Sequence, residues 1–143
     1  MGPQANIAYH DYTSTPSSSS PFHYKPQLPW IPDTGATHHM TSDAQNLHNV
    51  TEYKGIDQIQ VGNGQGLHIA NQSNAFFPSL HSPLHLKNIL HVPSLTKPIL
   101  SVKRLTTDNS CFFEFWPTYF LVKDQKIRVI LLQGPSEEGL YHL

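Results

Sequence analysis

The sequence predicts an all-β domain with one short helix, and three observations support this fold class. Apolar and polar residues alternate between Ile56 and Ala70 on both sides of Asn63-Gly64, the pair typical of a tight hairpin turn. The run Cys111–Phe115 is rich in residues that favour strands. Apolar residues from Ile99 to Leu105 recur at roughly helical spacing, before an Asn109 that can end a helix. With 143 residues, the chain has room for one domain and little more.

Residues 1–27 differ in composition from the rest of the chain. They contain a run of serines between Pro16 and Pro21, and six of the twelve prolines lie at or before Pro32. Such a segment cannot bury enough apolar surface to offset the entropy lost on ordering. We expect a disordered linker here, a folded domain over residues 28–115, and a C-terminal hairpin and junction over 116–143.

The first folded stretch carries the candidate for chemistry. Asp33 follows the apolar run that ends at Ile31, and Thr34, Gly35 and Ala36 come directly after it. Asp is rarely buried unless its carboxylate is satisfied, so Asp33 is either a surface turn residue or a held, functional carboxylate. On these letters alone the turn is the better interpretation, because Asp-Thr-Gly is ordinary turn chemistry.

Further strands follow the hairpin. We expect strands over residues 76–80 and 84–92, separated by prolines. After the helix, residues 111–115, 119–123 and 127–132 read as three more strands. The run 111–115 has almost no polar relief, so it is expected either at an exposed edge that pairs with another chain or paired internally with residues 119–122.

A series of motifs in a fixed order resembles the aspartic protease region of copia-type LTR retrotransposon Pol polyproteins. The resemblance covers roughly residues 28–143, and an ordered series is more specific than one short motif. The matching stretches are Trp30–Thr41 (WIPDTGATHHMT), Val61–Gly64, Ile89–Pro93, Ile99–Val102, Val122–Asp124, Leu131–Gly134 and Gly139–Tyr141.

This resemblance implies a retropepsin-like acid protease barrel that forms one lobe of a homodimer. It implies that Asp33 is catalytic, supported in its loop by Thr34, Gly35 and Ala36. The hairpin tip would be a flap that binds substrate through Val61, Gly62, Asn63 and Gly64. Leu100 and Ser101 would belong to a strand that supports the catalytic loop, with Ser101 where retroviral proteases carry a glycine, as is usual for the copia type.

Hydrolysis of a peptide by carboxylates needs two of them, one to accept a proton from water and one to donate a proton to the carbonyl. The chain has one Asp-Thr-Gly motif, so activity requires a dimer in which each subunit contributes Asp33. Two such carboxylates share one proton, and activity is expected to peak at mildly acidic pH. The substrate would be an extended peptide from the chain's own polyprotein, and no cofactor is needed.

Composition limits the partners and the compartment. Nine Lys plus Arg balance ten Asp plus Glu, which gives no indication of a nucleic-acid partner. One cysteine fits a reducing compartment, and neither a signal peptide nor an apolar run long enough for a membrane span is evident. We expect a cytoplasmic protein, within virus-like particles, that contacts no membrane.

Three other functions compete with the protease. The chain could be a protease-like module that no longer cuts and serves as a dimerisation or spacer element. Ten histidines suggest a metal-binding module, but no His pair has convincing ligand spacing, and His38-His39 side chains diverge on a strand or helix. A host peptidase of retroviral type would share the fold and differ only in its substrate.

Overall fold

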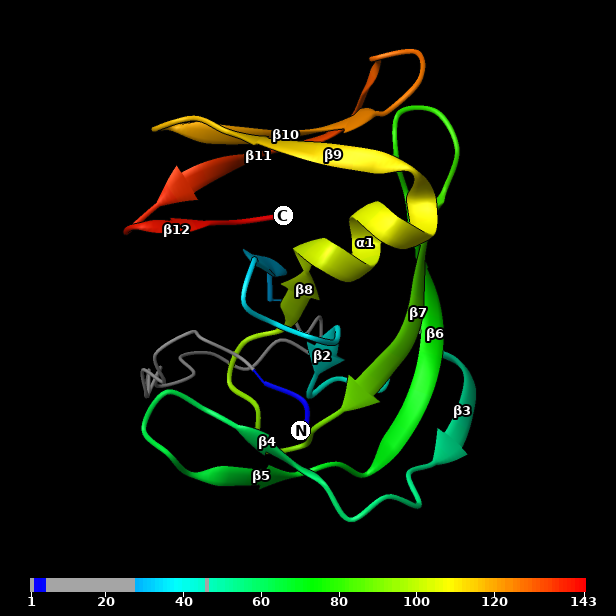
Figure 1. Cartoon of the computed structure of the whole chain (residues 1–143), viewed down its shortest axis with the longest axis vertical. Helices are drawn as coiled ribbons and strands as arrows, with labels where there is room; N and C mark the ends of the chain where they lie inside the picture. The colour runs from blue at the N-terminus through cyan, green and yellow to red at the C-terminus, as the bar shows by residue number, and fades with distance from the viewer. Residues whose placement is uncertain (1, 5–27, 46) are drawn as a thin grey trace, which may run out of the picture.

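The computed structural model describes residues 2–4, 28–45 and 47–143, so the linker expected over residues 1–27 lies largely outside the described residues. In this part of the chain the fold is mostly β with one short helix, as the sequence predicts (Figure 1). The strands that precede the helix are β1 (Ile31–Asp33), β2 (Met40–Thr41), β3 (His48–Glu52), β4 (Gln58–Gln60), β5 (Gly66–His68), β6 (Asn71–Phe77), β7 (Leu84–His91) and β8 (Ile99–Ser101). The helix α1 (Val102–Asn109) is followed by β9 (Cys111–Phe115), β10 (Tyr119–Asp124), β11 (Ile130–Glu137) and β12 (Leu140–Tyr141).

The strands form three sheets. A six-stranded sheet has the order β1-β8-β2-β7-β6-β3, a four-stranded sheet has the order β12-β11-β10-β9, and β4 pairs only with β5 among the named strands. In Figure 1 the four-stranded sheet lies at the top, the β4–β5 hairpin at the bottom, and α1 between them beside β8. Each layer buries one face against the others, as packed layers of a small domain must.

The insertion of β8 between β1 and β2 positions the candidate site. β8 runs parallel to β1, with Asp33 opposite Ser101, and antiparallel to β2 through the pair Met40–Ile99. The loop between β1 and β2 therefore has to cross the end of β8. Pro32 is tolerated in β1 because this strand lies at the edge of the sheet, where one side of the backbone needs no ladder partner.

The helix begins later than the sequence pattern predicts. The apolar spacing put Ile99 and Leu100 at the start of a helix, but both are buried in β8, in agreement with the strand that the resemblance implied at Leu100 and Ser101. Their backbones pair with strands on both sides, and this tertiary pairing overrides the local helical spacing. α1 begins at Val102 and ends at Asn109, where Ser110 adopts a left-handed conformation with φ 50°.

Two other strand predictions need correction at their ends. The strand expected over residues 76–80 is β6, which begins at Asn71 and ends at Phe77. The last strand was expected from Ile127, but residues 125–127 form the turn and β11 begins at Ile130. Asp124 accounts for this shift, because its carboxylate accepts hydrogen bonds from the N–H groups of Lys126 and Ile127 and prolongs the turn.

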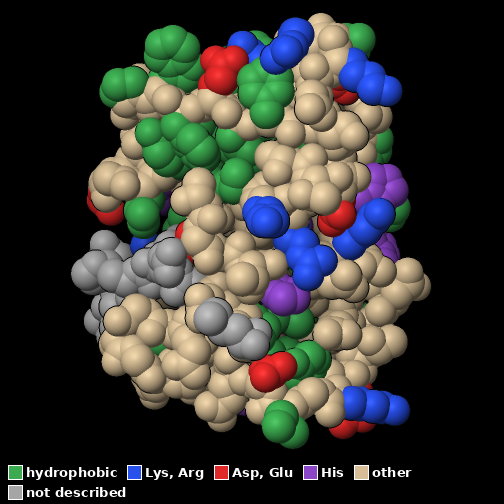
Figure 2. All heavy atoms as spheres, in the orientation of Figure 1, with side chains coloured by type: hydrophobic (Ala, Val, Ile, Leu, Met, Phe, Trp, Pro, Cys, Tyr) green, Lys and Arg blue, Asp and Glu red, His purple; other side chains and the backbone are tan. Residues whose placement is uncertain are grey.

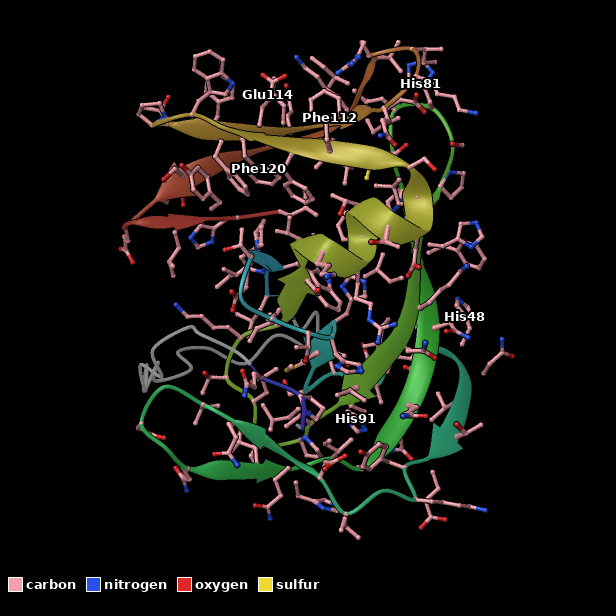
Figure 3. All side chains as sticks on the ribbon, in the orientation of Figure 1. His48, His81, His91, Phe112, Glu114 and Phe120 are labelled. Atoms are coloured by element: carbon pink, nitrogen blue, oxygen red, sulfur yellow. The ribbon has the colours of Figure 1, made fainter. Side chains whose placement is uncertain are left out.

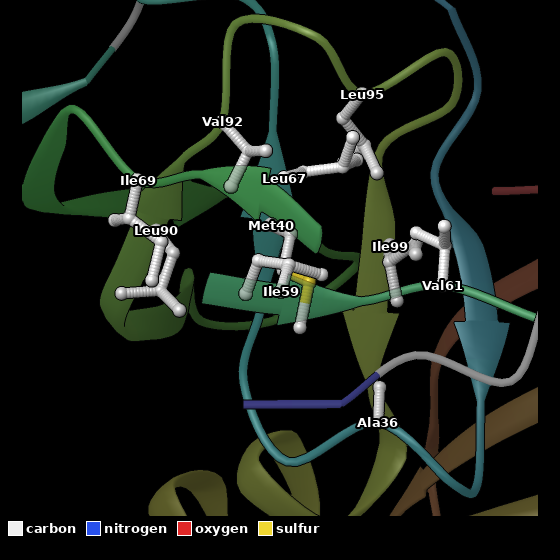
Figure 4. Close-up of a cluster of buried hydrophobic side chains, with 10 residues drawn as sticks. All are labelled: Ala36, Met40, Ile59, Val61, Leu67, Ile69, Leu90, Val92, Leu95 and Ile99. Carbon is white, nitrogen blue, oxygen red and sulfur yellow. The ribbon is translucent and has the colours of Figure 1, made fainter. Parts of the chain in front are cut away.

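Hydrophobic side chains form two buried clusters. The lower cluster joins the β4–β5 hairpin to β2, β7 and β8 (Figure 4), and its members are Ala36, Met40, Ile59, Val61, Leu67, Ile69, Leu90, Val92, Leu95 and Ile99. The upper cluster joins α1 and β7 to the four-stranded sheet and includes Leu100, Leu105 and Phe120. Phe120 lies on the inner side of that sheet, whereas Phe112 and Glu114 lie on its outer side (Figure 3).

The last strands are continuous with the rest of the fold. β9 pairs with β10 from Cys111 to Phe115, which confirms the internal pairing, and its other edge carries no strand among the described residues. Trp30 and Leu143 exchange backbone hydrogen bonds of 3.0 and 2.8 Å, which ties the end of the chain beside β1. The boundary expected between residues 115 and 116 falls between two strands of one sheet and stays a prediction.

Candidate active site

Asp33 is the last residue of β1 and is buried, with 7% of its surface exposed. Its Oδ1 accepts a hydrogen bond of 2.7 Å from the N–H of Gly35, so the loop turns back around its own carboxylate. Ala36 is buried beneath the loop, while Thr34 is exposed at its crest. Asp33 is thus a held carboxylate at the end of a buried strand, and an ordinary surface bend would not bury it.

Ser101, the last residue of β8, holds this loop in place through hydrogen bonds. Its hydroxyl, fully buried, donates a 2.7 Å hydrogen bond to the carbonyl of Ala36 and accepts one of 3.2 Å from the N–H of Arg104. The second bond makes Ser101 the N-cap of α1. The serine that stands here in place of a glycine therefore links the loop to the helix. Leu100, the preceding residue, is fully buried in the upper cluster.

His38, His39 and Arg104 complete the support. The sequence predicted that the two histidines hydrogen-bond around the loop or reach solvent, but it identified none of their partners. Arg104 donates from Nε to the carbonyl of Thr37 at 3.1 Å, and its Nη2 lies 3.2 Å from His38 Nε2. The N–H of Ser101 donates to His39 Nδ1 at 3.0 Å. These partners lie more than sixty positions away along the chain, so no local signal could have identified them.

Burial and the neighbouring charge of Arg104 disfavour the protonated form of both histidines. Burial, reinforced by the charge of Arg104 and then by His38, lowers the pKa of His39 to about 3. Burial and then Arg104 also lower the pKa of His38. A neutral His39 fits its geometry, because Nδ1 must lack a proton to accept from Ser101, which places the proton on Nε2.

The glycine-rich tip belongs to the β4–β5 hairpin, but its turn differs from the one predicted. The N–H of Gly64 donates to the carbonyl of Val61 at 2.9 Å, and the N–H of Val61 donates to the carbonyl of Gln65 at 3.2 Å. Asn63-Gly64 is therefore not the centre of a two-residue turn. Gly62 and Asn63 are central, and Gly64 follows with φ 82°, the pattern of a three-residue hairpin loop with a left-handed glycine.

The hairpin packs against the loop that carries Asp33. Val61 is buried in the same cluster as Ala36, and Figure 4 shows the two side chains with Ile99 between the hairpin and β8. Gly62, Asn63 and Gly64 are exposed. The structure thus brings Val61, at the start of the hairpin turn, to the Asp33 loop and leaves the three turn residues that follow it exposed.

A pocket of about 250 Å³ opens beside Asp33. It is lined by Ile31, Pro32, Asp33, Thr34, Phe115, Gly139, Leu140 and Tyr141. A larger cavity of about 440 Å³ lies elsewhere, between Trp30, Leu47 and Phe77, and does not include Asp33. We take the smaller pocket as the one relevant to Asp33 chemistry, because it alone of the two contains the carboxylate.

Two other kinds of site were sought in the part of the chain that the structure describes. No three His, Cys, Asp or Glu side chains gather there as a set that could hold a metal ion. None of its helices has the length and apolar character needed to cross a membrane.

Comparisons with known proteins point to retrotransposons. Residues 30–111 match the family described as Pol polyprotein, beta-barrel domain. The chain is 41% identical over 112 residues to the retrovirus-related Pol polyprotein from transposon RE1 of Arabidopsis thaliana, and 39% identical over 112 residues to that from transposon RE2. Each match covers 78% of this chain and 8% of the relative, so the chain spans a small part of their length. No solved structure matches.

Proposed function

This chain belongs to the Pol polyprotein beta-barrel domain family of retrotransposons, and on that premise we propose that it is the aspartic endopeptidase of its polyprotein. The observation that carries the proposal is the buried Asp33 carboxylate at the end of β1. Its loop is held by the Gly35 N–H and by Ser101, and the glycine-rich hairpin packs against it. Aspartate is rarely buried unless its carboxylate is satisfied, so a carboxylate buried and held in this way is a candidate for catalysis.

The second carboxylate comes from a second copy of the chain. A two-fold axis beside the Asp33 pocket would bring Asp33 of both subunits together, since a symmetric dimer repeats each contact on both sides. One carboxylate then accepts a proton from water while the other, protonated, donates to the scissile carbonyl. The pair shares one proton, the behaviour typical of aspartic-protease dyads, so no metal or covalent intermediate is required.

Phe115, at the edge of the pocket, is a suitable dimer contact. It is 41% exposed and lines the pocket that contains Asp33, whereas Trp116 and Tyr119 (46% and 40% exposed) stack on each other beside Glu114, on the outer side of the sheet. Figure 2 shows hydrophobic side chains gathered over the four-stranded sheet at the top of the view. Interface cores are enriched in aromatic residues and depleted of charged residues, which favours this face for the partner.

The substrate is an extended peptide, bound between the hairpin and the Asp33 loop, and the natural targets are junctions of the chain's own polyprotein. In this proposal the protein works in the cytoplasm within virus-like particles, with neither nucleic acid nor membrane as a partner. A host peptidase with other substrates would use the same site and differ in which peptides it cuts.

Cleavage of a peptide that spans a polyprotein junction tests the proposal, with Asp33→Asn and Asp43→Asn compared. Asp43 Oδ1 accepts from the N–H two residues on at 2.9 Å, as Asp33 Oδ1 does at 2.7 Å, so both variants keep the same local turn. We expect Asp33→Asn to lose on the order of 10³-fold or more in rate, and Asp43→Asn to keep its activity. Equal cleavage by both variants would remove Asp33 from the mechanism.

A mixing experiment tests the dimer. When equal amounts of wild-type and Asp33→Asn chains exchange subunits, about a quarter of the dimers carry two Asp33 residues. Activity should then be about a quarter of that given by the same total amount of wild-type chain. An activity of about half would indicate that each chain acts alone. If the wild-type chain sediments as a dimer but cuts no junction peptide, the inactive dimerisation module is the better description.

A further inference from the structure

A short segment of the chain, Gly2–Gln4, lies between the Asp33 loop and the hairpin. The carbonyl of Gln4 accepts from the N–H of Thr37 at 3.3 Å, and the N–H of Gln4 donates to Thr37 Oγ1 at 3.1 Å. On the other side, the N–H of Gln60 donates to the carbonyl of Pro3 at 3.4 Å. Thr37 is four residues after Asp33, so the segment contacts the candidate site directly.

The segment runs along β4 as an added strand. Gln4 forms a parallel bridge with Gln60, and a Cβ atom at Gly2 would lie 3.4 Å from the carbonyl oxygen of Gln58. In Figure 1 this segment, drawn in blue, passes beside β4, and Figure 4 shows the blue ribbon between Ala36 and the hairpin. β5 covers one edge of β4, so the opposite edge is the one that pairs with the added strand.

The segment is held through the main-chain atoms of Gln4 and through the buried side chain of Pro3. Gln4 bonds Thr37 through its own N–H and carbonyl, so another residue could replace it without loss of these bonds. Pro3 is buried, and its ring has no N–H to leave unsatisfied. A site of this kind accepts an extended peptide by strand addition and selects at the buried position.

We propose that the groove between Thr37 and Gln60 is a peptide-binding site and that residues 2–4 fill it as an intramolecular ligand. This inference rests on the proposed function insofar as the peptide that competes for the groove is the substrate. The tethered segment has a high effective concentration, so an external peptide binds only to the fraction of chains in which the groove is open. Its apparent affinity is the intrinsic affinity multiplied by that open fraction.

Two substitutions separate the contacts. Pro3→Asp places a charge at a buried position and should expel the segment. Gln4→Ala keeps the main-chain bonds and is the matched control. In the wild-type chain and in Gln4→Ala, we expect the amide hydrogens of Thr37 and Gln60 to exchange slowly, and in Pro3→Asp we expect both to exchange at least about tenfold faster.

Amide exchange followed by NMR, with a peptide-binding assay beside it, gives the test. The probe is a fluorescent peptide with the sequence of residues 1–8, which should bind Pro3→Asp on the order of tenfold more tightly than the wild type. Unchanged exchange at the Val122 amide in β10 would show that Pro3→Asp still folds. Equal exchange at Thr37 and Gln60 in the wild-type and Pro3→Asp chains would overturn the inference.

The same measurement on Asp33→Asn separates this inference from the proposed function. Asp33 makes none of the contacts described for residues 2–4, so protection of Thr37 and Gln60 should survive this substitution. Protection without any cleavage by the wild-type chain would refute the protease and leave the groove. Cleavage that requires Asp33, without protection, would refute the groove and leave the protease.

Discussion

Replacement of Ser101 by alanine tests whether one hydroxyl joins the Asp33 loop to the helix. The hydroxyl is fully buried and makes two hydrogen bonds, one to the Ala36 carbonyl and one from the Arg104 N–H. Alanine fits the same space and removes both bonds. The structural change is therefore confined to the connection between β8, the loop and α1.

The magnitude follows from the two bonds. Loss of a serine N-cap costs about 1 kcal/mol, and a buried carbonyl left without its donor costs about 1–3 kcal/mol. Because Ala36 and Arg104 lose the same partner, the two costs are coupled, and we expect a total of about 2–3 kcal/mol. For a chain of this length that corresponds to a fall in Tm on the order of 10 °C.

Urea unfolding of Ser101→Ala and Ser73→Ala provides the assay and its control. Ser73 is also buried, at 3% exposure, but its hydroxyl has no hydrogen-bond partner among the described residues. Ser73→Ala should therefore change stability by less than about 0.5 kcal/mol, or increase it slightly. If the two variants lose the same stability, the hydroxyl of Ser101 does not hold the loop and the reasoning is refuted.

Three further predictions concern the residues that hold the Asp33 loop and the turn of the hairpin. Burial holds the pKa of His39 at about 3, below the ordinary value of 6.5, so the unfolded chain binds a proton at a higher pH than the folded chain does. As the pH falls below 6.5, the free energy of unfolding should therefore fall by up to about 1.4 kcal/mol per pH unit. Urea unfolding at several pH values checks this, and a His39→Gln variant whose stability depends on pH with the same slope would contradict it. Gly64 has φ 82° with open space around it, so Gly64→Ala should cost about 1 kcal/mol and Gly64→Asn less; equal melting temperatures for the two would argue against a left-handed tip. Arg104→Gln should raise the pKa of His38 toward its usual value, and Arg104→Lys should not, because the neighbouring charge is kept; NMR titration of His38 that fails to distinguish the two variants would exclude that charge as a cause.

Local sequence predicted the hairpin and the strands β7, β9 and β10 well, because their alternation and composition depend on residues close in the chain. The alternation around Ile59 and Leu67 is correct, and both are buried in β4 and β5. The turn between them was misassigned by one residue. Asn63-Gly64 favours a two-residue turn, but Val61 bonds Gln65 and shifts the centre to Gly62-Asn63.

The start of the helix could not be predicted in the same way. The apolar spacing from Ile99 to Leu105 fits a helix, whereas the family resemblance implied a strand at Leu100 and Ser101, and the pairing of β8 with β1 and β2 decides for the strand. The supporting role of His39 was equally hidden. Its partner, Ser101, lies 62 positions away, and nothing near His39 in the sequence indicates it.

The sequence by itself determined the β-rich class, the loop that carries Asp33 and the hairpin with its glycines, because alternation and turn chemistry act over a few neighbouring residues. Only the tertiary structure decided that β8 enters between β1 and β2, that Ser101 and Arg104 hold the loop, and that residues 2–4 lie against Thr37. These contacts join residues about thirty to seventy positions apart. Such pairings are set by how the whole core packs, because burial of the clusters must be satisfied together with every hydrogen bond inside them.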